Sequence, residues 1–340
     1  MPAIETDVAL PSRTDVVIVG AGLTGLSAAL ALANARRDVL VIDRRIGHSA
    51  TVRSGGIIVG ETLVGPAPGF GHCEEALRQW VDAEAPSVEL DWTGGLELDR
   101  DDELSRTPID WMDDGPVRVS RTVPGGTLDP AALLAALATA VRSAGAKLVD
   151  HVPFEAYERG ADCITVFASG SRIEARRVLV ATDATSRPID DDWWPDRALT
   201  LALETEPLTD AQVSALGLDG TTPFFTNGAP LLWGRFLPSK ALLVGRELVP
   251  IGDGAVPRLK RALDAGGERL AWRLRHLHPT LVGLGVKRVW SGPIARDAGG
   301  VPALREDRAV RGAFWAGGYG GHGLAQAFRL GTLAAQRLLT

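Results

Sequence analysis

The chain has 340 residues, 45% of them hydrophobic and 23% charged, which is the ordinary balance of a globular protein. This length is a soft prior for two domains or one large one. The formal net charge of −6 gives no sign of a nucleic-acid partner, and no apolar run approaches the roughly 20 residues that a membrane-spanning helix needs. Two cysteines cannot build a disulfide framework and the N-terminus lacks the layout of a signal peptide, so we expect a cytoplasmic protein.

The segment from Asp15 to Asp43 predicts a strand, a glycine turn, a helix and a second strand that ends in an acid. Its β-branched start has the character of a buried parallel strand. In the G-x-G-x-x-G turn, Gly20 allows the tight turn, Gly22 lets the backbone approach a diphosphate, and Gly25 lets the helix pack against the strand. The unpaired N–H groups of the helix N-terminus favour that diphosphate.

These features in this order predict a dinucleotide site, and the alternative is a turn with a merely structural role. Asp43 lies about 20 residues past the turn, where a ribose 2′-hydroxyl needs an acceptor. An acid there favours a cofactor with a free 2′-hydroxyl, such as FAD or NAD, over NADP. Arg44 and Arg45 follow the acid and weaken this preference slightly.

A second clear helix signal comes in the middle of the chain. Asp129 is a favoured N-cap, Pro130 suits the first helical position, and Gly145 suits the C-terminal end. The polar, glycine-rich loop that follows Asp43 is small and flexible enough to wrap a ligand closely. Residues 146–182 then predict strands that return to the nucleotide-binding unit.

The last part of the chain repeats the pattern of an apolar strand, a glycine turn and an amphipathic helix, over residues 313–339. Before it, residues 188–289 form an irregular block of strands with a helical stretch at 256–278. The nucleotide-binding unit is therefore predicted to combine both ends of the chain with its middle. A simple NAD-dependent dehydrogenase usually keeps this unit contiguous, so the layout disfavours one.

Five segments, in this order, resemble the D-amino-acid oxidase superfamily of FAD-dependent oxidoreductases, near glycine oxidase, sarcosine oxidase and γ-glutamylputrescine oxidase. They are VVIVGAGLTGLSAALALA, GHSATVRSGGI, GGTLDPAALLAAL, VLVATDATSRP, and WSGPIARDAGGVPAL continuing through GGYGGHGLAQAFRLG. The resemblance implies an α/β (α+β) fold: a doubly wound, Rossmann-like FAD-binding domain of the glutathione-reductase type and an antiparallel-sheet substrate domain. The FAD-binding domain would comprise residues 1–70, 121–187 and 289–340, and the substrate domain residues 71–120 and 188–288.

The resemblance also implies which residues bind FAD. The expected cofactor-binding residues are Gly20, Gly22, Leu23, Thr24, Gly25, Asp43, Arg44, Ser49, Ala50, Thr51, Arg53, Ser54, Gly55, Gly56, Phe154, Thr182, Asp183, Gly320, Gly321, His322, Gly323 and Leu324. The helix that begins near Gly323 would offer N–H donors to the N1–C2 edge of the flavin, which is anionic when reduced. A glycine-rich turn without a ligand is the alternative there.

His322 and Arg53 are the expected catalytic residues. His322 has two interpretations, either a position over the flavin that tunes it or acts on substrate, or a helix cap or solvent-facing side chain. FAD is expected to be non-covalent because Cys73 lies in an insert and Cys163 in a strand. No spacing of His, Cys and Asp suggests a metal site.

The chemistry that the resemblance implies is oxidation of a C–N bond of an amine or amino acid. Hydride passes to flavin N5, an imine forms, and dioxygen is the expected acceptor, giving hydrogen peroxide; whether the enzyme is an oxidase or a dehydrogenase stays open. Family members commonly carry an arginine for the substrate carboxylate where this chain has Ile294, which favours an amine or a carboxylate held elsewhere. Trp233, Arg235 and Phe225 are the expected substrate residues, with core packing or a solvated surface as the alternative.

Two other functions stay open: a flavin monooxygenase, which the late GGYGGHG motif disfavours, and a flavin-binding subunit without turnover of its own. The expected partner is a small-molecule amine or amino acid, with no nucleic acid and no membrane. The oligomeric state is left open.

Overall fold

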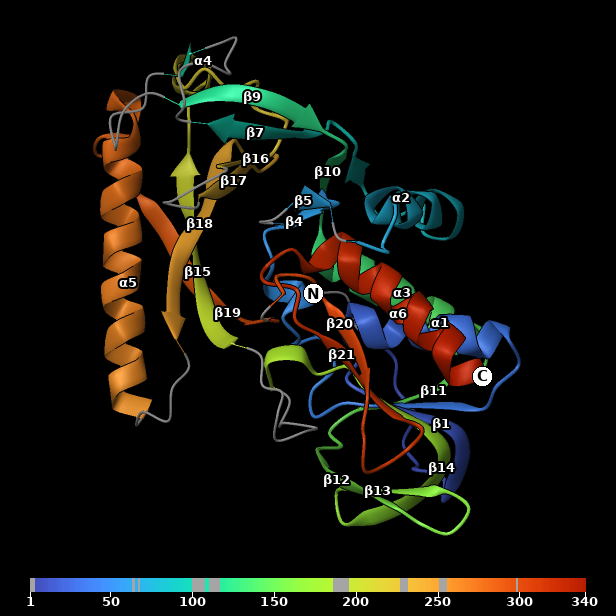
Figure 1. Ribbon diagram of the computed structural model, residues 1–340. Helices are drawn as coiled ribbons and strands as arrows, with labels where there is room; N and C mark the ends of the chain where they lie inside the picture. Colours follow the sequence, from blue (N-terminus) through green and yellow to red (C-terminus); the bar gives the residue numbers. More distant parts are fainter. Residues whose placement is uncertain are drawn as a thin grey trace.

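The computed structural model describes residues 4–62, 65–66, 68–99, 108–109, 117–185, 196–226, 232–250, 256–297 and 299–340. Figure 1 shows two parts, each organised around one large sheet, with both chain termini in the same part. The fold is mixed α/β with parallel and antiparallel pairing, as predicted.

The first sheet contains the parallel strands that the nucleotide-binding unit requires, with strand order β11-β2-β1-β14-β13-β12; β21 also pairs with β14, and β20 pairs with β21. Its strands are β1 (Arg13–Val19), β2 (Val39–Ile42), β11 (Lys147–Val149), β12 (Phe154–Arg159), β13 (Ile164–Ala168), β14 (Ser171–Val180), β20 (Ala303–Glu306) and β21 (Ala313–Gly317). Strands β11, β2, β1, β14 and β21 run parallel to one another. Their carboxyl ends therefore meet at one edge, where ligands bind in open α/β sheets.

Four helices cover one face of this sheet in a shared hydrophobic core. They are α1 (Leu23–Asn34), α2 (Cys73–Glu84), α3 (Pro130–Ser143) and α6 (Gly323–Leu339). The predicted start of α3 is confirmed, because the Asp129 side chain accepts a hydrogen bond from the Ala131 N–H at 2.8 Å. Gly145 follows the helix with a φ of +94°, which a glycine adopts most easily. On the opposite face of the sheet, side chains of β13 and β14 form a second core with side chains of β1 and β2.

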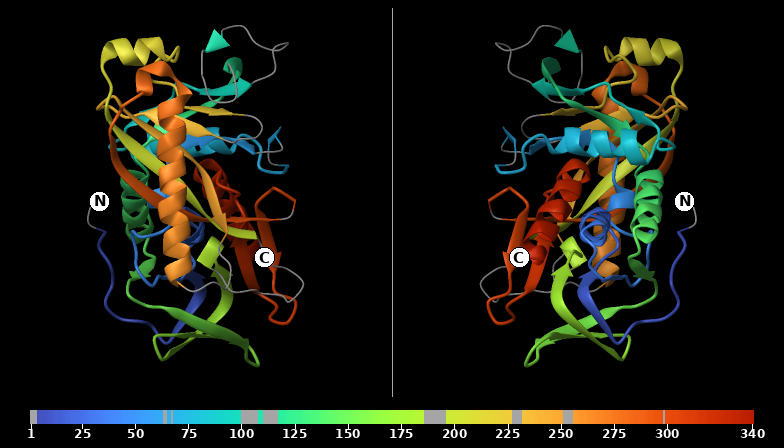
Figure 2. Two further views of the ribbon diagram at one scale, coloured as in Figure 1. Left: turned by 90° about the vertical axis from the view of Figure 1, so that its left-hand side faces the viewer. Right: turned by 90° about the vertical axis from the view of Figure 1, so that its right-hand side faces the viewer.

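The second sheet is antiparallel except for one pair, in the order β19-β15-β18-β17-β16-β7-β9-β8. Its strands are β7 (Gly95–Asp99), β8 (Pro108–Ile109), β9 (Val117–Val123), β15 (Asp196–Pro207), β16 (Phe224–Thr226), β17 (Trp233–Phe236), β18 (Ala241–Pro250) and β19 (Val286–Arg296). The predicted helix at 256–278 is α5 (Val256–Leu277). It covers the outer face of this sheet (Figure 2), where Leu270 and Leu274 share a core with Leu201 and Val244.

Smaller elements join the two parts. A three-stranded sheet of β3 (Ile57–Val59), β10 (Gly125–Leu128) and β6 (Leu90–Asp91) accompanies the pair β4 (Glu61–Thr62) and β5 (Gly65–Pro66). The short helices are α4 (Asp210–Ala215), η1 (Thr51–Arg53), η2 (Asp183–Thr185) and η3 (Pro279–Leu281). The predicted domain division stays a prediction: its boundary between 187 and 188 lies outside the described residues, and β19 runs across the boundary between 288 and 289.

Candidate cofactor and substrate site

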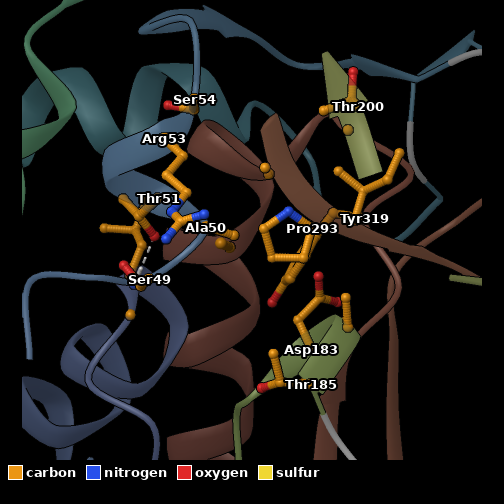
Figure 3. Close-up of a pocket in the computed structure, with 18 of the residues that line it drawn as sticks. Ser49, Ala50, Thr51, Arg53, Ser54, Asp183, Thr185, Thr200, Pro293 and Tyr319 are labelled. Atoms are coloured by element: carbon orange, nitrogen blue, oxygen red, sulfur yellow. Dashed lines mark hydrogen bonds between the residues drawn. The ribbon is translucent and has the colours of Figure 1, made fainter. Parts of the chain in front are cut away.

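A cavity of about 1620 Å³ lies between the two sheets and is lined by residues of both. This volume exceeds the range of about 300–1,000 Å³ that is usual for small-ligand pockets, so it suits a large cofactor together with a substrate. In Figure 3, the loop from Ser49 to Ser54 lies on one side of the cavity, and Asp183 and Tyr319 lie across from it.

The first glycine turn shows which glycines the protein itself requires. Gly20 has a φ of +107°, and a Cβ atom there would lie 2.7 Å from the Ala181 carbonyl oxygen. A Cβ atom on Gly25 would lie 1.9 Å from the Gly20 carbonyl oxygen. Gly22 differs, because its nearest neighbours would be Ser49 and Thr51 atoms at 3.7 Å, and it lines the cavity. The space beside Gly22 is therefore available to a ligand.

The N-terminus of α1 meets this space, and one of its N–H groups is bonded within the protein. Its N-cap is Gly22, which has no side chain to cap the helix, and no acid stands in its first turn. The Leu23 N–H donates to Thr51 Oγ1 at 3.3 Å, and Leu23 and Thr24 line the cavity. Free N–H groups and the positive end of the helix dipole form a site for an anion such as a diphosphate.

Asp43 is held at the end of β2 by two backbone donors. The Ala21 N–H donates to its Oδ2 and the Arg45 N–H to its Oδ1, both at 2.7 Å. The carboxylate lines the cavity and keeps further lone pairs for ribose hydroxyl donors. Arg44 lines the cavity beside it.

The loop from Ser49 to Gly56 lies between α1 and the second sheet. Ser49 Oγ is buried without a hydrogen-bond partner among the described residues, which is the state expected of a group that binds a ligand. The Trp290 indole Nε1 donates to the Arg53 carbonyl at 3.0 Å, and Arg53 Nη1 donates to the Ser291 carbonyl at 3.3 Å. β19 of the second sheet thus fixes the loop at Arg53.

The second glycine turn approaches the same cavity from the other end of the chain. Gly320 and Gly321 have φ values of +61° and +98°, and no atom outside the turn lies within 4 Å of a Cβ built on Gly321. Helix α6 begins at Gly323 without a side-chain cap or an acid in its first turn. Tyr319 and Thr24 share a hydrogen bond through their hydroxyl groups, which ties the two glycine turns together.

One row of cross-strand neighbours forms the wall of the cavity on the side of the second sheet. In order across the sheet, the row is Arg121, Glu97, Phe225, Trp233, Gly245, Ala202 and Trp290. The Trp233 indole lies over Gly245 and against Gly55, since a Cβ atom on either glycine would lie within 2.3 Å of the ring. The row therefore presents an aromatic surface with a small side chain at Ala202 and charged side chains at one end, Glu97 and Arg121.

The FAD dependent oxidoreductase (DAO) family model matches residues 15–337. The chain belongs to this family. It is 27% identical over 174 residues to the probable electron transfer flavoprotein-quinone oxidoreductase YdiS of Escherichia coli (strain K12), a match that spans 51% of this chain and 37% of that protein. It is 23% identical over 383 residues to the probable oxidoreductase OrdL of Rhizobium meliloti (strain 1021), covering 96% of this chain and 83% of that protein.

The fold of this DAO-family protein is shared with solved structures. The crystal structure of glycine oxidase from Geobacillus kaustophilus superposes with a TM-score of 0.75 at 18% sequence identity, covering 97% of this chain and 95% of that one. The predicted family, fold class and FAD dependence are therefore confirmed.

The residues present fit FAD. The open space at Gly22, the unpartnered Ser49 Oγ and two uncapped helix N-termini face one cavity. Of the expected cofactor residues, Gly25 and Gly56 do not line the cavity. Gly56 has a φ of +72°, and a Cβ atom there would lie 2.3 Å from the Leu128 carbonyl oxygen, so its role is to allow close backbone packing.

His322 lines the cavity and occupies the N-cap position of α6, but its side chain makes no capping hydrogen bond. Burial lowers the pKa of its imidazole, and the hydrogen bonds to Gly320 and Tyr319 only partly offset this effect. A neutral imidazole can donate from one nitrogen and accept at the other.

Asp183 stands out on the opposite wall. Its φ of +45° is unusual for a residue with a side chain, and its carboxylate accepts a hydrogen bond from the Gly318 N–H at 2.8 Å. Burial raises the pKa of this carboxyl to about 6, against the effect of the backbone hydrogen bonds. The side chain thus links the end of β14 to the turn that follows β21.

Two residues at the far end of the cavity were not predicted as site residues. The Tyr157 hydroxyl donates to Asp307 Oδ2 at 2.6 Å, and both residues line the cavity next to the expected Phe154. Their pairing joins β12 to the loop after β20, across 150 positions of the chain. No local pattern in the sequence indicates such a contact.

Trp233 and Phe225 line the cavity as expected, but Arg235 does not. Its guanidinium group lies beside Gly56, and its Nε is buried without a hydrogen-bond partner among the described residues. Burial lowers the pKa of this guanidinium, while the charges of Asp129 and Asp91 raise it. In this arrangement the Arg235 side chain points at the loop rather than into the cavity, and its contact with substrate stays a prediction.

Among the described residues, no group of three or more His, Cys, Asp and Glu side chains is placed to hold a metal ion. None of the helices in the described ranges combines the length and the apolar character needed to cross a membrane.

Proposed function

We propose that this protein oxidises a C–N bond of an amine or amino acid with non-covalently bound FAD, and that dioxygen is its electron acceptor. The observation that supports this function is one continuous cavity that joins both glycine turns to the aromatic wall of the second sheet. A cofactor bound at the two glycine turns would present its reactive end to a substrate that lies on the aromatic wall of the second sheet.

The residues that would hold FAD follow from the cavity. The N-terminus of α1 at Gly22 would bind the diphosphate, and Asp43 would accept from the adenosine ribose. Tyr157 and Phe154 would line the adenine end. Ser49, Thr51 and Arg53 would face the flavin from one side, and the turn from Gly320 to Leu324 would supply N–H donors at its edge. When bound, FAD supplies the acceptor for a hydride from the carbon beside the nitrogen.

The chain's own contribution is binding, orientation and exclusion of water. Trp233, Ala202 and Trp290 form an apolar wall against which the substrate would lie. Positioning alone accounts for a large share of the rate in such reactions, so no dedicated base is required. A neutral His322 at the N-terminus of α6 can accept a proton from a substrate ammonium group, which leaves the lone pair of the substrate nitrogen free.

The test is anaerobic titration of the purified yellow protein with amines and amino acids. Bleaching of the flavin absorbance by an amine in the absence of NADH supports the proposal, and peroxide on readmission of air supports dioxygen as the acceptor. Bleaching by NADH or NADPH alone would point to a monooxygenase. A yellow protein that no donor bleaches would point to a subunit without turnover.

A further inference from the structure

Two indole rings of the second sheet each reach the loop around η1. The Trp233 ring extends from β17 over Gly245 of β18 and meets Gly55 of the loop, because a Cβ atom on either glycine would lie within 2.3 Å of the ring. Trp290 of β19 donates from its indole Nε1 to the Arg53 carbonyl at 3.0 Å. The two rings therefore contact the loop at positions two residues apart, with β15 between their strands.

Ala202 of β15 forms the floor of the space between the two indoles. It pairs with Gly245 on one side and with Trp290 on the other. Neighbouring strands lie about 4.8 Å apart, so about 10 Å separates β18, which the Trp233 ring covers, from β19. A planar group packed between two side chains needs about 7–8 Å, which is two van der Waals contacts. The space above Ala202 therefore admits one flat ring, and we call it the indole slot.

The indole slot is closed at one end and open to the cavity at the other. Thr200 and Ala202 line the cavity, whereas Glu204, two residues further along the same face of β15, does not. The Glu204 carboxylate is buried and accepts from Lys287 Nζ at 2.8 Å and from Arg288 Nε at 2.6 Å. The cavity thus reaches Ala202 and ends before this ion-pair cluster.

The surroundings of the indole slot suit an uncharged aromatic group. The Trp290 N–H is already bonded to the loop, and the backbone of Ala202 belongs to a strand that is paired on both sides. The Arg53 guanidinium donates to the Ser291 carbonyl at 3.3 Å. A ligand group in the slot would therefore meet two aromatic rings and a methyl group. Aromatic rings gain stability from stacked or edge-to-face contacts beyond the area that they bury.

We propose that the indole slot binds an aromatic ring of the substrate, that Ala202 limits how deeply the ring enters, and that the substrate is therefore an amine that carries an aryl group. The inference rests on the proposed function for the amine, but binding of a ring in the slot does not depend on turnover.

The experiment measures binding of benzamide, an uncharged ring without an oxidisable C–H beside its nitrogen, to the FAD-loaded protein by calorimetry. Ala202→Leu should weaken benzamide binding at least tenfold, because the larger side chain fills the slot, while the flavin content stays at the wild-type level. Ala202→Gly should bind benzamide at least as tightly as wild type. Trp233→Leu should weaken binding at least fivefold, because it removes one of the two indoles.

Ala198→Leu is the matched control, because Ala198 lies on the same strand as Ala202 but does not line the cavity. Unchanged benzamide binding in both Ala202→Leu and Trp233→Leu would overturn the inference. A colourless Ala202→Leu protein would also overturn it, since the slot would then hold the cofactor.

The proposed function is judged separately by bleaching of the flavin. Bleaching by alkylamines but not by benzylamine or 2-phenylethylamine would uphold the proposed function and overturn the inference. Binding of benzamide that depends on Ala202, without bleaching by any amine, would support the slot and refute the proposed function.

Discussion

Asp183→Asn should make the folded protein more stable at high pH but not at low pH. Asparagine has nearly the same size, tolerates the positive φ of 45°, and keeps an oxygen that accepts from the Gly318 N–H. The substitution therefore removes the charge together with one of the two oxygens that accept backbone hydrogen bonds.

The magnitude follows from the raised pKa of Asp183. Burial raises that pKa from 3.8 to about 6, so the folded state holds the proton more tightly than the unfolded state does. A difference of about 2 in pKa corresponds to about 3 kcal/mol. The protonated side chain gives full stability below pH 3.8, and this stability is lost as the pH rises through about 6. Because Asp183 also borders the cavity, 3 kcal/mol is an upper value.

The assay is urea unfolding of wild type and variant at saturating FAD, at pH 5, 6.5 and 8. We expect the variant to gain up to about 3 kcal/mol at pH 8 and about half of that at pH 5. Asp219→Asn is the matched control of opposite sign, since hydrogen bonds from Thr222 and Thr221 outweigh desolvation there and lower the pKa of that carboxyl. A variant less stable than wild type at pH 8, or an effect independent of pH, would refute the reasoning.

Three other substitutions test the site. Gly22→Val should yield a folded but colourless protein, because its side chain would occupy the space beside Ser49 and Thr51; flavin absorbance checks this, with Gly299→Ala as control, and full yellow colour would contradict it. Gly25→Ala should prevent stable folding, since its Cβ atom would lie 1.9 Å from the Gly20 carbonyl oxygen; a normal melting temperature would count against this. Tyr157→Phe should weaken FAD binding roughly tenfold, because Asp307 Oδ2 loses the hydroxyl that donates to it. Fluorescence titration of the apoprotein with FAD measures the affinity, and an unchanged affinity would contradict the prediction.

The features of this fold that depend on neighbouring residues could be predicted from the sequence, and those that depend on distant residues could not. The unit from Asp15 to Asp43 and the capped helix after Asp129 could be predicted because strand composition, glycine positions and capping residues act over a few neighbours. The second glycine turn near Gly321 was identified by the same logic. In these segments, the local conformation that each residue favours is also the one that its role requires.

The direction of a side chain across the fold could not be predicted in this way. Arg235 and Trp233 share one strand face, yet the sheet aims Trp233 at the cavity and Arg235 at Gly56. Tyr157 meets Asp307 across 150 positions, and Arg246 reaches the cavity beside a register shift between two strands.

The amino-acid sequence by itself therefore determined the family, the FAD-binding turns and the order of the main elements. Only the tertiary structure decided which arginines line the cavity and which carboxylates are buried. The physical reason is that strand pairing and packing between distant segments set the surroundings of each side chain, and these surroundings control its exposure, its partners and its pKa.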